Sequence, residues 1–175
     1  IIKAMEVVKE ISGQPKMNVT AFCVGGTMSS TAIAVQKARG VDVVNSLTLL
    51  TTFLDFSETG VMDVFIDDGM VLRNELKMAK GGLATAKMLN STFSWLRPNE
   101  LVWNYVVSHY FKGEAPAAFN ILYWNADSTN LPGPFYAWYL RNTYLENNLA
   151  KPDHTVVCGE KVNFGRLDIP AFVYS

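Results

Sequence analysis

The fold is decided by one short stretch of sequence, Met17-Asn18-Val19-Thr20-Ala21-Phe22-Cys23-Val24-Gly25-Gly26-Thr27. The run up to Cys23 is β-prone, and a helical stretch from about Met28 to Arg39 follows the two glycines. Cys23 therefore stands at the turn between a strand and a helix, which is the structural context of a nucleophile elbow. The usual pattern of such an elbow is Gly-x-Ser-x-Gly, and here Cys replaces Ser and Ala21 replaces the first Gly.

This turn has the features that a covalent catalyst needs. Small residues are expected on both flanks, at Ala21 and Gly25, because the apex of an elbow has a strained backbone and the following helix packs closely on the strand. A thiol at a helix N-terminus meets free backbone N–H groups and the positive end of the helix dipole, and both stabilise negative charge. We expect Cys23 to be the catalytic nucleophile and the Val24 N–H to bind an oxyanion. The alternative is a small buried cysteine in a glycine turn.

Helical and strand patterns alternate around the elbow. Apolar residues recur at helical spacing over residues 2–11 and predict a helix that ends at Gly13, and Gly40 would end the helix that follows Cys23. Residues 46–52 form a second β-prone run, whose continuous apolar character is typical of a strand buried on both faces. This order of helix, strand, helix and strand predicts an α/β fold with a parallel sheet.

The alternation stops between residues 53 and 151. Helical patterns cover 63–78, 98–112 and 133–149, and a turn-rich segment, 125–134, separates the last two. A hairpin is predicted over 155–158 and 161–164, around Gly159-Glu160, and a strand over 170–175. We therefore predict an α/β core at 1–52, a large helical cap insertion at 53–151, and a return to the core at 152–175.

The composition excludes several classes of protein. Fifteen Lys and Arg against sixteen Asp and Glu give a net charge of −1, which removes the electrostatic basis of a nucleic-acid binder. Apolar residues make up 49% of the chain and charged residues 18%, which excludes a disordered protein. No apolar stretch approaches the ~18 residues of a transmembrane helix. Two cysteines are too few for a secreted disulfide scaffold, so we expect a reducing, cytoplasmic compartment.

A nucleophile needs a base, and the chain offers only His109 and His154. Neither follows the strand that should present the catalytic acid, so we expect both to be surface or core-edge residues. The acidic residues at 55, 58, 63, 67 and 68 lack the spacing of a calcium loop. Cys158 has no second Cys or His at metal-ligand spacing and is expected to be a buried thiol. The glycines match neither the dinucleotide nor the phosphate-loop pattern, so we expect no metal and no cofactor.

Several blocks of sequence make the chain resemble a known family. They run in the family's order and cover nearly the whole chain, at 22–27 (FCVGGT), 49–56 (LLTTFLDF), 93–99 (FSWLRPN), 101–105 (LVWNY), 127–134 (DSTNLPGP) and 139–147 (YLRNTYLEN). With these blocks the chain resembles the polyhydroxyalkanoate synthases, and is most similar to the class I enzymes. Ala21 is a departure, since the family usually has Gly there.

The resemblance implies an α/β-hydrolase core with a helical cap, with Cys23 as the nucleophile and the Val24 N–H as an oxyanion donor. It also implies an acyltransferase that polymerises (R)-3-hydroxyacyl-CoA with release of CoA, as a homodimer joined through the cap, at the surface of cytoplasmic polyester granules. The family's catalytic Asp and His lie beyond the strand that ends at Ser175. We therefore expect the chain to be part of a longer enzyme and to be inactive alone.

Two other functions remain open. A cysteine hydrolase of the dienelactone type shares the Cys elbow, although such a small enzyme does not need an aromatic-rich insertion. A non-catalytic fragment that binds granules or a partner subunit is the second, because Cys23 would lack its base. Polymer and free CoA formed by the chain alone would contradict the expectation that it is inactive.

Overall fold

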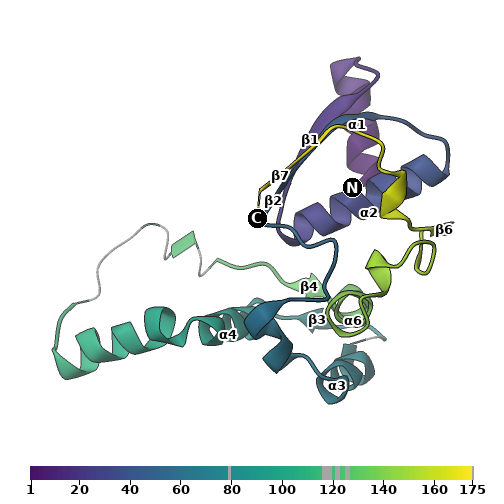
Figure 1. Cartoon of the computed structure of the whole chain (residues 1–175). Coiled ribbons are helices and arrows are strands. Elements are labelled where there is room, and N and C mark those ends of the chain that lie inside the picture. Colours follow the sequence, from purple (N-terminus) through teal and green to yellow (C-terminus); the bar gives the residue numbers. More distant parts are fainter. Residues whose placement is uncertain (79, 116–119, 121–122, 125–126, 175) are drawn as a thin grey trace. The chain divides into compact units, whose positions relative to one another are not determined.

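The computed structural model describes residues 1–78, 80–115, 120, 123–124 and 127–174. The chain divides into two compact units, one formed by Ile1–Glu58 with Asn142–Ser175 and the other by Thr59–Arg141. The second unit is thus inserted into the sequence of the first (Figure 1). It falls within the range expected for the helical cap, and its role as a cap stays a prediction.

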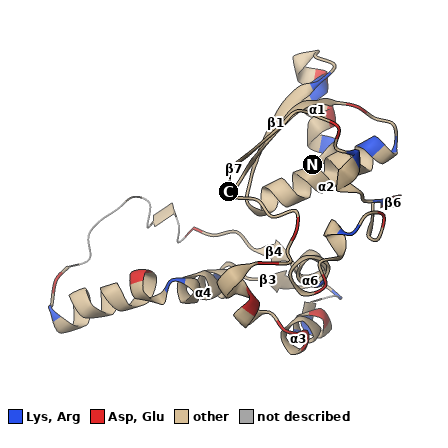
Figure 2. Cartoon of the chain, in the orientation of Figure 1, with Lys and Arg blue, Asp and Glu red and all other residues tan. Residues whose placement is uncertain are grey.

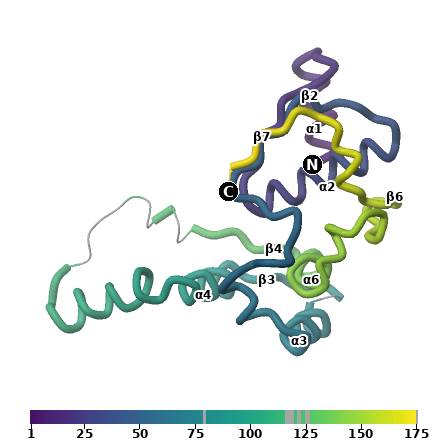
Figure 3. The backbone as a smooth tube through the Cα atoms, viewed as in Figure 1, coloured from purple at the N-terminus to yellow at the C-terminus, as the bar shows by residue number. Residues whose placement is uncertain are grey.

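The first unit contains a three-stranded parallel sheet. Its strands are β1 (Met17–Phe22), β2 (Val44–Leu50) and β7 (Ala171–Tyr174), and their order is β1-β2-β7. Val19 pairs with Leu47, which pairs in turn with Ala171. In Figure 3 the yellow end of the tube accordingly runs beside β2, although the two strands are far apart in the sequence. The predicted parallel α/β fold is confirmed, while Ser175, the last residue of the predicted strand, lies outside the described residues.

Two helices of the first unit lie on either side of β1 in the sequence. α1 (Ile2–Ser12) ends at Gly13, whose φ of 65° is the left-handed cap conformation expected there. α2 (Val24–Ala38) begins directly after Cys23 rather than near Met28, because the two glycines form its first turn instead of a loop. The buried apolar cluster of this unit draws on α1, α2 and both of the first two strands: Met5, Ala21, Ile33, Val43, Val44, Leu47 and Leu49.

Burial along β2 differs from the expectation of a strand buried on both faces. Val44, Leu47 and Leu49 are buried, whereas the side chains between them are half-buried or exposed. The three buried residues belong to the core cluster, which includes Ile33 of α2, and the register of β1 on β2 shifts between Val44 and Ser46. An apolar run in the sequence therefore overstated the burial of the side chains between the three buried residues.

The second unit is mainly helical, as predicted, but its elements are more broken than the sequence pattern suggested. They are η1 (Gly60–Phe65), α3 (Asp68–Met78), β3 (Leu83–Ala84), α4 (Ala86–Leu96), the π-helical segments η2 (Asn99–Trp103) and η3 (Val106–Phe111), β4 (Leu131–Pro132) and α6 (Gly133–Leu140). The helix expected over 63–78 is interrupted, since the Asp67 carboxylate accepts the N–H of Met70 (2.6 Å) and so caps the start of α3. α4 was not predicted. Residues 125 and 126 of the turn-rich segment lie outside the described residues.

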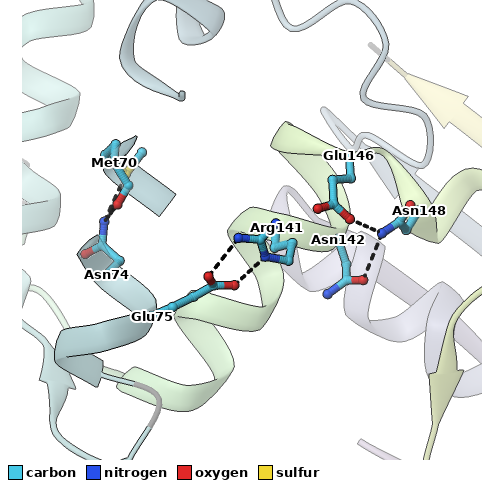
Figure 4. A network of polar contacts seen from close by, with 7 residues as sticks. All are labelled: Met70, Asn74, Glu75, Arg141, Asn142, Glu146 and Asn148. Carbon is cyan, nitrogen blue, oxygen red and sulfur yellow. Dashed lines mark hydrogen bonds and ion pairs between the residues drawn. The ribbon is translucent and has the colours of Figure 1, made fainter. Parts of the chain in front are cut away.

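Contacts between α3 and α6 organise the second unit. A Cβ on Gly133 would lie 2.8 Å from the Met78 Cβ, so a glycine is required where α6 starts against the end of α3. Farther along, Arg141 binds Glu75 of α3 with two nitrogens, Nε to Oε1 and Nη2 to Oε2, the latter at 2.7 Å (Figure 4). Arg141 holds the pKa of Glu75 below its ordinary value of 4.5. The ion pair thus joins α3 to Arg141, the last residue of this unit.

The two units divide at Glu58/Thr59 and at Arg141/Asn142, and aromatic and amide contacts join the segments of the first unit beside these two points. The Phe56 ring meets that of Tyr144 edge-on, with centroids 4.9 Å apart, and the Phe56 N–H donates to Asn147 Oδ1 (3.0 Å). Tyr144 belongs to η4 (Arg141–Leu145), and Asn147 lies in the turn before η5 (Asn148–Ala150). At the start of η5, Asn148 Nδ2 donates to Glu146 Oε2 (2.6 Å; Figure 4).

A short hairpin precedes the last strand of the sheet. β5 (Val156–Val157) pairs with β6 (Glu160–Lys161), and η6 (Phe164–Arg166) follows. The turn lies at Cys158-Gly159, one residue earlier than expected, and both residues have positive φ (51° and 84°), as in the tight turns that suit two-residue hairpins. Cys158 is therefore exposed, contrary to the expected buried thiol.

Two further features of the chain are its distribution of charge and the length of its helices. Lys and Arg residues, blue in Figure 2, and Asp and Glu residues, red there, are interspersed along both units. Among the described residues, every helix is too short or too polar to cross a bilayer.

Candidate active site

Cys23 has the backbone geometry expected of an elbow apex. It stands between the end of β1 and the start of α2, with φ 53° and ψ −131°. A non-glycine residue in such a region carries strain of about 1–3 kcal/mol and persists only where its surroundings hold it. The first restraint is the Cys23 N–H, which donates to Leu50 O at the end of β2 (3.0 Å). The thiol is exposed, so the alternative of a cysteine buried in a glycine turn is wrong.

The residues after Cys23 supply backbone donors beside the thiol. The Cys23 carbonyl accepts the N–H of Gly26 (2.9 Å), which closes the first turn of α2. Val24 is the first residue of the helix, so its N–H precedes any carbonyl that could accept it within the helix. An N–H of this kind next to a nucleophile can bind the oxyanion of a tetrahedral intermediate.

The close approach between helix and sheet occurs at Gly26 rather than at Gly25. A Cβ on Gly26 would lie 2.8 Å from the Thr52 Cβ and closer still to the other atoms of that side chain, whereas a Cβ on Gly25 would meet open space. The close approach that the elbow pattern predicts at Gly25 thus occurs one residue later. On the other flank Ala21 is buried in the core cluster, so a methyl group fits there.

Two threonines near the elbow were missed by the sequence analysis. The hydroxyl of Thr52, just beyond β2, lies 3.3 Å from Cys23 O and 3.1 Å from Leu50 O, and Thr27 Oγ1 of α2 donates to Phe53 O (2.6 Å). Both residues stood within the quoted blocks 22–27 and 49–56, but threonine after a strand has no signature of its own in a sequence. Only the fold brings the two segments together.

The two histidines belong to different units of the chain, His154 to the first and His109 to the second. His154 is exposed in the turn before β5, where its N–H donates to Lys151 O (3.2 Å). His109 lies on η3 of the second unit, with Nδ1 3.3 Å from Glu114 O. Within the described residues of the first unit, no hydrogen bond joins the His154 ring to Cys23. Both keep the surface or edge role expected of them.

The acidic residues after β2 hold local structure. Asp55 accepts the N–H of Ser57 (2.9 Å) and the amide of Asn147 (2.7 Å), and these bonds lower the pKa of its carboxyl. Asp63 accepts a bond from Thr59. Across residues 1–78, 80–115, 120, 123–124 and 127–174, no three His, Cys, Asp or Glu side chains gather where they could hold a metal ion.

Comparison with known proteins agrees with this geometry. The chain is 52% identical to the poly(3-hydroxyalkanoate) polymerase subunit PhaC of Cupriavidus necator over 99% of its length. It is 38% identical to the corresponding subunit of Rhizobium meliloti and to the poly(3-hydroxyalkanoate) polymerase of Methylorubrum extorquens, each over 97% of its length. The chain spans 30%, 28% and 28% of these three relatives. The resemblance to polyhydroxyalkanoate synthases is thereby confirmed.

A family model agrees with the sheet and the elbow. The model of the alpha/beta hydrolase fold matches residues 1–172, which include β1, Cys23, α2 and β2. Because the match covers nearly the whole sequence, the chain belongs to the α/β-hydrolase fold family.

Proposed function

We propose that this chain carries the nucleophile of an acyltransferase that polymerises (R)-3-hydroxyacyl-CoA into polyhydroxyalkanoate. One observation carries the proposal: Cys23 is an exposed thiol at a positive-φ turn between a parallel strand and a helix, in a chain 52% identical to a poly(3-hydroxyalkanoate) polymerase subunit. An exposed nucleophile in such a turn is accessible to substrate and lies beside free N–H groups of the helix.

In the proposed reaction, the Cys23 thiolate attacks the thioester carbonyl of the substrate. The Val24 N–H stabilises the oxyanion, the carbon–sulfur bond to CoA breaks, and the CoA thiolate takes up a proton and leaves. The acyl group is then a thioester of Cys23. The 3-hydroxyl of another acyl unit attacks this thioester, gives its proton to a base, and forms one ester while Cys23 is released. Exchange between thioesters is nearly balanced, so the acyl-enzyme stays reactive.

The remaining parts of the proposal come from the family. A His–Asp pair outside these 175 residues would serve as the base. The second unit, Thr59–Arg141, would act as a cap through which two copies associate, and the protein would work at the surface of polyester granules in the cytoplasm. The chemistry requires only a nucleophile, a base and oxyanion donors, so no cofactor enters the proposal.

The test uses the protein expressed from its complete gene and (R)-3-hydroxybutyryl-CoA. Cys23→Ala should lower CoA release by about 10³-fold or more, since the covalent step is lost. Cys158→Ser is the matched control, because Cys158 is also exposed but lies in a hairpin turn, and it should keep full activity. Mass spectrometry of the wild type should find the acyl adduct on the Cys23 peptide.

Two results would contradict the proposal. Polymer formation by Cys23→Ala would remove Cys23 from the mechanism. Release of CoA together with free 3-hydroxybutyrate, and without polymer, would instead identify a hydrolase of the dienelactone type.

A further inference from the structure

Hydroxyl groups tie the loop after β2 to the elbow. Thr52 Oγ1 lies within hydrogen-bond distance of two carbonyls, Cys23 O at 3.3 Å and Leu50 O at 3.1 Å. The next residue of the loop is Phe53, and its carbonyl accepts a hydrogen bond from the hydroxyl of the buried Thr27 at 2.6 Å. The loop is also held on its other side, where the Thr51 N–H donates to Tyr174 O of β7 (2.7 Å). Thr52 is therefore fixed between the end of β2 and the apex of the elbow.

The helix is shaped to admit this side chain. Any Cβ at position 26 would overlap the Thr52 side chain, with 2.8 Å to its Cβ. Gly26 therefore lets the first turn of α2 lie directly on Thr52, and that contact keeps the hydroxyl near Cys23 O. The neighbouring Gly25 has no such contact.

The bond to Cys23 O bears on the oxyanion donor because of peptide geometry. The carbonyl of Cys23 and the N–H of Val24 belong to one planar trans peptide unit, so the two point in opposite directions. A group that restrains Cys23 O consequently restrains the direction of the Val24 N–H. Among the described residues, the Gly26 N–H donates to this oxygen at 2.9 Å, and the Thr52 hydroxyl, which Cys23 O shares with Leu50 O, lies 3.3 Å from it.

We propose that Thr52 is a positioning residue for acyl transfer: its hydroxyl holds the Cys23–Val24 peptide so that the Val24 N–H points at the developing oxyanion. This inference rests on the proposed function of Cys23. Thr52 itself touches neither substrate nor thiol in this mechanism. Its effect passes through the orientation of a single peptide.

The test compares two reactions of Cys23 in the complete protein. Acylation by (R)-3-hydroxybutyryl-CoA creates an oxyanion, whereas alkylation by iodoacetamide does not, so only acylation depends on the Val24 N–H. Thr52→Val removes the hydroxyl and keeps the branched shape, and should lower kcat about tenfold to a hundredfold with little change in KM. The rate of alkylation should stay within twofold of the wild type, and Thr52→Ser should restore most of kcat.

Controls separate this role from a loss of stability. Thr48→Val changes the same residue type earlier in β2, away from the elbow, and should have wild-type kcat. If Thr52→Val does not fold, as judged by its melting transition, Thr52→Ala removes the hydroxyl without adding apolar bulk and replaces it in both assays.

The outcomes are distinct. Unchanged kcat in Thr52→Val, with an active wild type, overturns this inference and leaves the proposed function intact. An equal loss of acylation and alkylation also overturns it, because the elbow as a whole would then have been disturbed. A wild-type protein that releases no CoA overturns the proposed function, and this inference with it.

Discussion

The two units of the chain differ in how they treat their apolar side chains. The first unit gathers residues from α1, α2, β1 and β2 into one buried cluster, with Ile33 1% exposed. In the second unit, α4, η2 and η3 contain no buried residue among those described, and large side chains such as Trp95, Trp103 and Tyr110 are exposed. The strained turn at Cys23 thus lies beside the buried cluster of the first unit, whereas the buried apolar residues of the second unit lie in α3, β3 and α6. Exposed apolar surface such as that of α4, η2 and η3 is typical of interaction sites.

The largest effect should come from emptying the core of the first unit. Ile33→Ala should lower the free energy of unfolding by about 2–5 kcal/mol, because it removes a fully buried side chain and leaves a cavity. Leu76→Ala in α3 is the matched control, since Leu76 is 77% exposed, and should stay within about 0.5 kcal/mol of the wild type. Urea unfolding of the purified protein measures both. Equal losses in the two variants would contradict the difference in burial between Ile33 and Leu76.

The next effect concerns the contact between helix and sheet at the elbow. Gly26→Ala should cost about 1–3 kcal/mol, because the new methyl group overlaps Thr52. Gly25→Ala, its neighbour in the same helical turn, should range from neutral to about 1 kcal/mol stabilising, because its methyl group meets open space and alanine favours the helix. Thermal unfolding of both variants decides the point. The reverse order of stabilities would place the close approach at Gly25, as the sequence pattern had suggested.

Much of the first unit could be read from the sequence because its signals are local. The period of the residues before Gly13, the β-prone run up to Phe22 and the small residues around Cys23 each act within one turn or strand, and the structure agrees with them. The start of α2 was missed because glycines usually mark turns. Here Gly26 lies in the helix, and the side chain of Thr52, which is distant in sequence, occupies the space that a Cβ at position 26 would need.

The candidate site was only half accessible to such reasoning. Cys23 and Val24 could be proposed from the sequence because one elbow contains both. Thr52 and Thr27 were not, because their relation to the elbow depends on parallel pairing of β1 with β2 and on where the loop turns afterwards. In the second unit, the breaks at Asp67 and within 98–112 depend on a side-chain cap and on π-helical turns, which apolar spacing does not reveal.

A smaller effect on stability is expected from the ion pair between Arg141 and Glu75 in the second unit. Glu75→Gln removes the charge that meets both nitrogens of Arg141, and should cost about 1 kcal/mol, because the pair is bidentate and partly buried. The folded pKa of Glu75 is lowered, so this contribution is present above pH 4.5 and disappears as the pH falls through the folded pKa. Native-state hydrogen exchange should show faster exchange in α3 and α6. Equally faster exchange in β1 and β2 would mean that the units do not open separately.

The smallest effect is expected at the end of the sheet opposite the elbow, where Lys37 of α2 binds Asp168 (2.7 Å) and Asp42 (2.9 Å). Asp168 and Asp42 raise the pKa of Lys37 above 10.5. In turn, Lys37 lowers the pKa of Asp168, and Lys16 and Lys37 lower that of Asp42, both below 3.8. The carboxylates stabilise the fold above their unfolded pKa and lose this effect as the pH falls through their folded pKa. The Lys37 ammonium loses its stabilising effect as the pH rises through its own folded pKa.

Lys37→Met should therefore be less stable than the wild type by a constant amount between pH 4 and pH 10. Below pH 4 and above pH 10, the difference in stability between Lys37→Met and the wild type should become smaller. Lys3→Met, which removes an exposed charge on α1, should show no difference in stability from the wild type. A gap that stayed the same at pH 2.5 would mean that Lys37 stabilises the sheet through its aliphatic stem rather than through its charge.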